Sequence, residues 1–139
     1  MFPPNTKILI VDDMPSLRDL LKAYLRRRGF TNIIQAKDGR EAFETLRNAQ
    51  TTPNPVELVI SDWNMPILDG LELLKLVRNT PEWKQLPFLL LTTESEKGKV
   101  LEAVLAQVSN YIVKPVEEDV LREKLTKVWE KFNATKAAS

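Results

Sequence analysis

The sequence contains no cysteine and no histidine. Without cysteine, the chain cannot form a disulfide framework, a thiolate metal site or a thiol nucleophile. Without histidine, it lacks the commonest general base and the commonest catalytic metal ligand, and it cannot carry a phosphohistidine. Any metal site or nucleophile in this chain must therefore use other groups, of which carboxylates, hydroxyls and lysine amines are the main ones.

The sequence also lacks an excess of one charge and a long hydrophobic run. Twenty Lys and Arg residues stand against nineteen Asp and Glu residues, so no bulk field attracts nucleic acid or an anionic membrane. No apolar run approaches the ~20 residues of a membrane span, and the start, MFPPNTK, does not resemble a signal peptide. We therefore expect a cytoplasmic protein that binds neither nucleic acid nor membrane.

The length of 139 residues fits a single domain with a substantial core. Only the two ends have the composition of loose segments, at residues 1–5 and 133–139. We therefore expect one domain over residues 1–139, with a folded core at about residues 7–132.

Short apolar runs alternate with amphipathic segments along this core. The apolar runs predict strands at residues 7–12, 32–36, 57–61, 87–92 and 111–114. The amphipathic segments predict helices at residues 16–28, 40–48, 70–78, 99–107 and 117–132. Strands that are apolar along their whole length are typical of a parallel sheet covered by helices on both faces. The sequence thus predicts an α/β fold of five strand–helix units.

Polar side chains follow four of the predicted strands, at the sheet edge where such folds bind ligands. In chain order they are Asp12, Asp13, Asp62, Asn64, Thr92 and Lys114. Each has an ordinary explanation when taken alone, such as a helix cap for the aspartate pair, a turn for Asp62 or solvation for Lys114. Their occurrence at successive strand ends favours a shared site.

Three carboxylates a few ångströms apart repel one another, and a hard cation removes that repulsion. Ligand sets made only of oxygen suit Mg²⁺. Asp13 and Asp62 are the expected side-chain ligands, Asp12 is a second or water-mediated ligand, and the backbone carbonyl of Asn64 is a further candidate. At such a site a carboxylate can attack phosphorus to form an aspartyl phosphate, while Lys114 neutralises the phosphoryl oxygens.

Four segments, ILIVDD, VISDWNMPILDG, LLLTTE and YIVKP, make the chain resemble the receiver domains of two-component response regulators. The match runs from about Lys7 to Phe132. The sequence that begins at Ser61 is most similar to that of single-domain chemotaxis regulators of the CheY type. The resemblance implies a doubly wound, flavodoxin-like (βα)5 fold with five parallel strands in the order 2-1-3-4-5.

The resemblance also implies that Asp62 is the phosphoacceptor, with Asp12, Asp13 and the backbone carbonyl of Asn64 at Mg²⁺. A histidine kinase would supply the phosphoryl group, and a phosphatase is a further partner that the family allows. The chain would act on no separate substrate: it would only phosphorylate itself from a donor and dephosphorylate itself.

Three further roles come from the same resemblance. Thr92 would be the switch hydroxyl, Lys114 the phosphate-binding lysine and Tyr111 the switch aromatic. In this family the aromatic turns inward when the switch hydroxyl is drawn to the phosphoryl group. We therefore expect a population shift between two arrangements of the chain.

The chain departs from the family pattern near the site. Thr93 stands where the family usually has a small residue, and Met14 stands beside the acidic pair. Residues 107–110, QVSN, replace the usual glycines before Tyr111. Without those glycines, Asn110 is the residue that we expect to take a left-handed conformation.

We expect no output module after the fifth predicted helix, so the signal would pass by protein–protein contact. The expected surface combines the fourth helix, the fifth strand and the fifth helix, with the residues Lys97, Val100, Val104, Tyr111, Val113, Val116, Lys124 and Lys127. Our leading hypothesis is a monomeric, phosphorylation-dependent switch that binds a flagellar motor switch protein.

Other interpretations stay open from the sequence. The chain could be a stand-alone receiver that acts as a phosphate sink or relay adaptor. A Mg²⁺-dependent phosphohydrolase of the haloacid dehalogenase type would need an Asp-x-Asp pair and a cap domain, whereas Asp12 and Asp13 are adjacent and no cap domain is expected. A binding module independent of phosphorylation would not need the complete acidic site.

Overall fold

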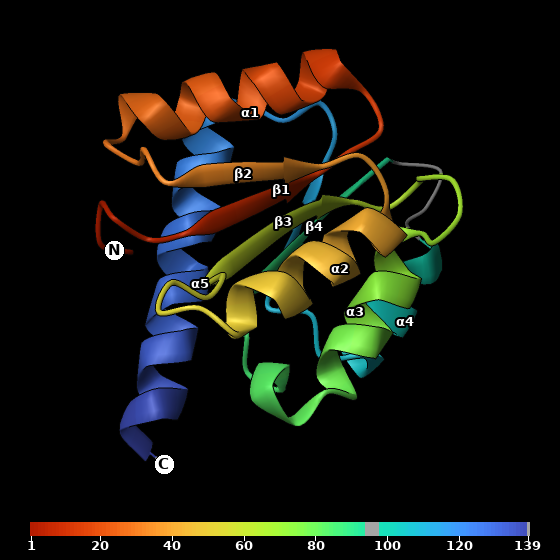
Figure 1. Cartoon of the computed structure of the whole chain (residues 1–139). Helices are drawn as coiled ribbons and strands as arrows, with labels where there is room; N and C mark the ends of the chain where they lie inside the picture. Colours follow the sequence, from red (N-terminus) through yellow and green to blue (C-terminus); the bar gives the residue numbers. More distant parts are fainter. Residues whose placement is uncertain (94–97, 139) are drawn as a thin grey trace.

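A computed structural model describes residues 1–93 and 98–138 of the chain. In this part of the chain, five parallel strands form one sheet in the order β2-β1-β3-β4-β5 (Figure 1). The strands are β1 (Ile8–Val11), β2 (Ile33–Ala36), β3 (Leu58–Asp62), β4 (Phe88–Thr92) and β5 (Asn110–Val113). The predicted α/β class and the order 2-1-3-4-5 are confirmed.

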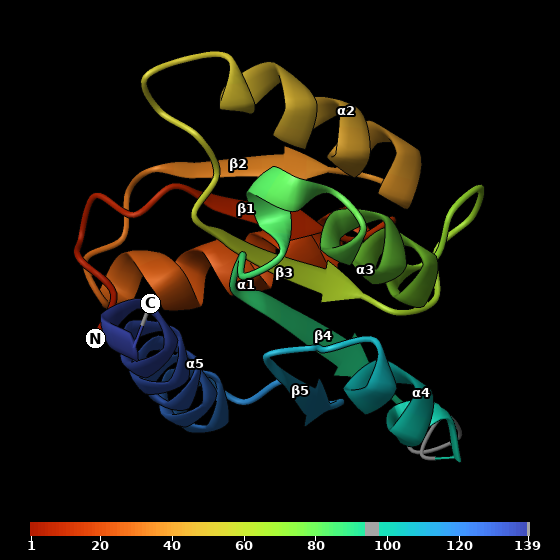
Figure 2. The ribbon, with the colours of Figure 1, turned by 90° about the horizontal axis from the view of Figure 1, so that it is seen from below.

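Helices cover both faces of this sheet, as Figures 1 and 2 show. The helices are α1 (Pro15–Arg27), α2 (Gly39–Gln50), α3 (Gly70–Arg78), α4 (Val100–Leu105) and α5 (Glu118–Ala138), and the short 3-10 helix η1 (Pro81–Trp83) precedes β4. Helices α1 and α5 pack on one face, and α2, α3 and α4 pack on the other. No helix of the described chain combines the length and apolarity needed to cross a membrane.

The sheet separates two hydrophobic cores because successive strand residues point to opposite faces. Ile8 and Ile10 of β1 pack with α1 and α5, whereas Leu9 and Val11 pack with α2 and α3. All four side chains are fully buried. Burial on both faces explains why β1 is apolar throughout rather than alternating.

Helix α1 begins one residue before the predicted start at residue 16. Met14 is its N-cap residue and makes no side-chain cap bond, and Pro15 occupies the first helical position. The helix ends before Gly29, which has φ +91°. The aspartates that precede Met14 are therefore not used to cap the helix.

The connection between β3 and α3 is tightly constrained. Asp69 and Glu72 form a capping box at the start of α3, and the Gly70 N–H donates to the carbonyl of Trp63 at 2.8 Å. Gly70 lies so close to β3 that an added Cβ would contact the backbone oxygen of Asp62. Glycine at this position is therefore required by the close approach of α3 to the end of β3.

The turn after α4 differs from the prediction. Gln107, and not Asn110, takes the left-handed conformation, with φ +67°. The N–H groups of Gln107 and Val108 donate to the carbonyls of Val104 and Ala103 and close the helix in a Schellman motif. Asn110 begins β5, and its side chain accepts a hydrogen bond from the N–H of Tyr111.

The two ends of the chain are more ordered than their composition suggests. Helix α5 continues past the predicted end at Phe132 to Ala138. Near the other terminus, Phe2 is buried, and its ring centroid lies 5.0 Å from that of Trp129 on α5. Packing of an aromatic pair thus joins the N-terminal segment to the last helix.

We expect Gly70→Ala to lower the free energy of unfolding by about 1–3 kcal/mol, because the new methyl group displaces backbone of β3. Gly98→Ala is the matched control: an added Cβ there meets no atom of the described residues within 4 Å, so its effect should stay below about 1 kcal/mol. Urea denaturation of both variants measures the difference. Equal stabilities would contradict the packing described for α3.

Candidate functional site

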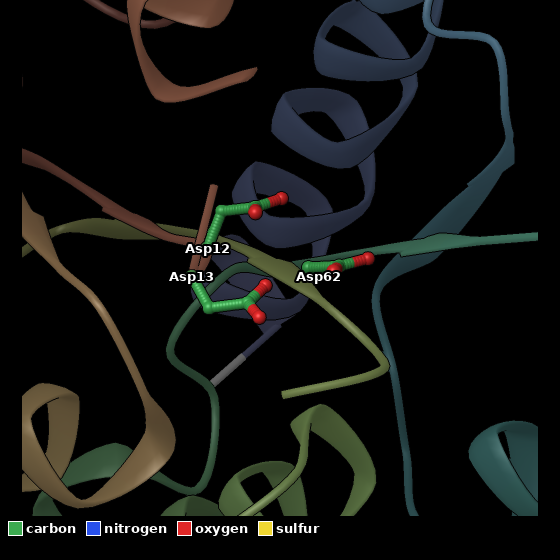
Figure 3. Close-up of side chains that lie close together, drawn as sticks. All are labelled: Asp12, Asp13 and Asp62. Atoms are coloured by element: carbon green, nitrogen blue, oxygen red, sulfur yellow. The ribbon is translucent and has the colours of Figure 1, made fainter. Parts of the chain in front are cut away.

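Three aspartates gather at the carboxyl edge of the sheet (Figure 3). Asp12 and Asp13 directly follow β1, and Asp62 is the last residue of the neighbouring strand β3. One carboxylate oxygen of each lies within 4.8 Å of the others. The predicted convergence of Asp12, Asp13 and Asp62 is thus found in the structure.

Asp12 is fully buried, and its two oxygens have different surroundings. Oδ1 accepts a hydrogen bond from the Met14 N–H at 2.8 Å. Oδ2 is enclosed and has no hydrogen-bond partner in the described part of the chain. Burial raises the pKa of Asp12 to about 6, against the lowering effect of the Met14 hydrogen bond. An enclosed carboxylate oxygen without a donor fits a site that accepts a cation.

Asp62 is ion-paired with the predicted lysine. Lys114 Nζ lies 2.7 Å from Asp62 Oδ1, and the Asp62 side chain is 8% exposed. Burial raises the pKa of Asp62, while the hydrogen bond and charge of Lys114 lower it. Lys114 directly follows β5, and its N–H donates to the carbonyl of Thr92 at 2.6 Å. This bond helps to position the lysine at the same edge as the aspartates.

Thr92 ends β4, the strand between β3 and β5. Asp62 pairs in register with Leu91, so Thr92 lies one residue further toward the carboxyl edge. Its side chain is buried, and its hydroxyl donates to the carbonyl of Thr93 at 3.3 Å. Asn64 lies two residues beyond Asp62 and is exposed. The use of the Asn64 carbonyl as a metal ligand stays a prediction.

Tyr111 lies on β5, the last strand in the order of the described sheet. It pairs in register with Leu90, two residues before Thr92. The ring is half-buried and packs against the core of α2 and α3. Lys124 Nζ of α5 lies 5.5 Å from the ring centroid. The ring thus lies between the hydrophobic core on one side and the Lys124 side chain of α5 on the other.

The structure changes the predicted output surface in two ways. Val116 is buried in the core shared by α1 and α5, so its placement on the surface was wrong. Leu101 and Leu105 of α4, which the sequence reasoning did not name, are 67% and 74% exposed. Lys97 lies outside the described residues. Apolar residues in a short amphipathic segment do not reveal by themselves which face is covered.

Arg18 was also missed by the sequence reasoning. Its Nη1 donates to the backbone carbonyl of Asp12 at 2.5 Å, and its Nε donates to Gln35 Oε1 at 3.1 Å. The side chain thereby joins α1, the end of β1 and β2. No motif marks this arginine, because its position depends on how α1 packs beside the sheet.

This fold and site define the class of the protein. Residues 8–126 match the response regulator receiver domain family, and the chain belongs to that family. Members of the family typically bind Mg²⁺ at an acidic pocket, and the described part of this chain has a cluster of three carboxylates, those of Asp12, Asp13 and Asp62.

Within this family the chain is CheY-like. It is 43% identical over 120 residues to the chemotaxis protein CheY1 of Helicobacter pylori, covering 86% of this chain and 93% of that protein. It is 40% identical over 127 residues to CheY of Pseudomonas aeruginosa, covering 91% and 98%. The structure of the chemotaxis response regulator CheY4 of Vibrio cholerae superposes with a TM-score of 0.77, at 35% identity, covering 89% of this chain and 98% of that one.

We expect the metal-free chain to lose stability as the pH rises. Folded Asp12, with a pKa of about 6, holds a proton at pH values where the unfolded carboxyl, with its ordinary pKa of 3.8, has released it. In EDTA, the free energy of unfolding should therefore fall by up to about 3 kcal/mol between about pH 4 and pH 7. Urea denaturation across this range measures the slope.

The variant Asp12→Asn should reduce this slope and raise the stability in EDTA at neutral pH, because it removes a buried charge. Asp19→Asn on α1 is the matched control, since Asp19 is exposed and its substitution should leave the slope unchanged. If Asp12→Asn and the unsubstituted chain had the same slope, the assignment of the pH dependence to Asp12 would be refuted.

Proposed function

We propose that this chain is a cytoplasmic chemotaxis response regulator in which phosphorylation of Asp62 switches the binding of a partner protein. The observation that carries the proposal is the ion pair of 2.7 Å between Asp62 and Lys114, beside two further carboxylates at the same sheet edge. Similarity to chemotaxis proteins of the CheY type supports the biological setting. The chain itself would catalyse only its own phosphorylation and dephosphorylation.

The residues present fit a resident Mg²⁺ ion. The carboxylates of Asp12, Asp13 and Asp62, together with the backbone carbonyl of Asn64, are the groups that would hold it. When bound, the ion neutralises the crowded carboxylates and the phosphoryl oxygens. An ion held here would also offset the buried charge of Asp12, whose Oδ2 has no hydrogen-bond partner in the described chain.

Asp62 is the nucleophile in this proposal. A carboxylate oxygen of Asp62 attacks the phosphorus of a phosphohistidine on a histidine kinase. A P–O bond forms as the P–N bond breaks, and the leaving imidazole takes up a proton from solvent. In the free chain, Lys114 Nζ lies 2.7 Å from Asp62 Oδ1. After phosphorylation, its ammonium group pairs with the phosphoryl oxygens and so stabilises the product.

Thr92 and Tyr111 would transmit the effect of Asp62 phosphorylation to the surface of the molecule. A phosphoryl oxygen on Asp62 offers the Thr92 hydroxyl a charged acceptor in place of the carbonyl of Thr93, which it now reaches at 3.3 Å. Movement of Thr92 changes the space next to Tyr111, whose ring is half-buried. A difference of about 1.4 kcal/mol between the two states is enough to change their ratio tenfold.

The output surface in this proposal is the outer face of α4 with β5 and α5. Its apolar residues Leu101, Val104 and Leu105 are 67%, 54% and 74% exposed, which is unusual for three side chains on one short helix. Lys124 and Tyr111 lie at the adjoining edge of this face. We propose that a flagellar motor switch protein binds here to the monomeric chain.

Trp63 should report occupation of the site, because it directly follows Asp62 and is 2% exposed. We expect its fluorescence to change on addition of Mg²⁺ and again on addition of acetyl phosphate or beryllofluoride. In Asp62→Asn the second change should be lost. Trp83 and Trp129 lie at the opposite end of the sheet and should contribute a constant background. An undiminished response in Asp62→Asn would refute Asp62 as the acceptor.

Leu105→Asp should weaken binding of the motor switch protein at least about tenfold, because it places a charge in the apolar face of α4. Calorimetry with and without beryllofluoride measures this change. Leu20→Asp, at a position 39% exposed on α1, is the control and should bind normally. If the unsubstituted chain accepts phosphoryl groups but binds no motor protein in either state, the chain is a phosphate sink or relay adaptor instead.

A further inference from the structure

Ile67 has a backbone conformation that is rare for a β-branched residue. Its φ is +73°, and the N–H of Leu68 donates across it to the carbonyl of Pro66 at 2.8 Å. These two observations define a γ-turn of the strained kind, with Ile67 at its centre. Glycine or asparagine would fit this position with less steric conflict between Cβ and the backbone.

The turn is imposed from both sides. The carbonyl of Leu68 accepts a hydrogen bond from the N–H of Gly39 at the start of α2, at 3.1 Å. On the other side, Asp69 caps α3 and Gly70 is held against Trp63. The surrounding structure therefore maintains the turn whatever residue stands at position 67.

The isoleucine side chain adds little to the packing of the free chain. It is 73% exposed, whereas its loop neighbours Met65 and Leu68 are partly buried against the core of α2 and α3. Ile67 is part of neither hydrophobic cluster of the described chain. A strained backbone and an exposed aliphatic side chain thus occur together at a residue that belongs to neither described hydrophobic cluster.

Ile67 lies on the loop that follows the phosphoacceptor strand. It is five residues beyond Asp62, and Met14, which is 55% exposed, is two residues beyond Asp12. The loops that carry them, between β3 and α3 and between β1 and α1, leave the same edge of the sheet (Figure 1). Two exposed apolar side chains therefore border the edge that holds the acidic cluster of Asp12, Asp13 and Asp62.

We infer that Ile67, with Met14, forms an apolar docking contact for the phosphodonor domain of the histidine kinase. The inference rests on the proposed function, since the donor must bring a phosphohistidine to Asp62 and so must cover the edge from which both loops project. The Asp62 side chain is only 8% exposed, so the donor surface has to approach these loops closely. Burial of Ile67 in the complex would remove its apolar surface from water. This burial would contribute binding free energy that the side chain does not provide in the free chain.

Ile67→Asn tests this role, because asparagine tolerates the positive φ and removes the apolar contact. Transfer is measured from two donors that both break a P–N bond. One is a phosphorylated chemotaxis histidine kinase that transfers to the unsubstituted chain, and the other is phosphoramidate, which has no protein surface. We expect kcat/KM for the kinase to fall at least about tenfold, and the rate with phosphoramidate to stay within about twofold.

Two control variants separate docking from folding. Ile67→Val keeps a β-branched apolar side chain and should transfer from the kinase nearly as fast as the unsubstituted chain. Leu76→Asn changes an apolar residue that is 40% exposed near the far end of α3, and it should leave kinase transfer unchanged. Ile67→Asn should also raise the Tm, because the backbone strain is relieved.

The outcomes are distinguishable. Normal kinase transfer in Ile67→Asn, or an equal loss with both donors, would overturn the docking role. A lowered Tm in Ile67→Asn would overturn the strain on which the inference depends. If the unsubstituted chain accepts no phosphoryl group from phosphoramidate, the proposed function itself fails, whatever Ile67 does.

Discussion

The burial of carboxylates at one edge of the sheet is the constraint on which the rest of the structure depends. Asp12 and Asp62 lose their hydration at the ends of β1 and β3, and this loss raises the pKa of each. The ion pair with Lys114 and the hydrogen bond from Met14 offset part of the cost. The remaining cost links the stability of the folded chain to the protonation of these carboxylates.

The parallel sheet connects this edge to the outer surface. Thr92 ends β4, Lys114 directly follows the adjacent strand β5, and Tyr111 lies on β5 three residues before Lys114. A change at Asp62 therefore has to cross only one intervening strand to reach the side chains that border α4 and α5. Because the core on both faces is closely packed, the proposed switch would require a second discrete arrangement of these side chains and not a gradual deformation.

The two loops that border the edge differ in how they are held. Between β3 and α3, the close approach of Gly70 and the capping box leave the turn at Ile67 little freedom. Between β1 and α1, the Met14 N–H is tied to Asp12, and Arg18 holds the Asp12 carbonyl. Rigid loops preserve the spacing of the acidic groups, and they present the side chains of Ile67 and Met14 to whatever approaches Asp62.

The sequence by itself determined the fold class, the strand order through family resemblance, and the acidic site, because apolar runs and strand-end charges are local signals. It also placed the first helix, predicted at residues 16–28, within one residue of the observed bounds Pro15–Arg27. Only the tertiary structure decided that Val116 is buried, that Leu101 and Leu105 are exposed, and that Gln107 takes the left-handed turn in place of Asn110. Those outcomes depend on which helix face meets the sheet and where a helix ends, and both are set by packing between segments far apart in the chain.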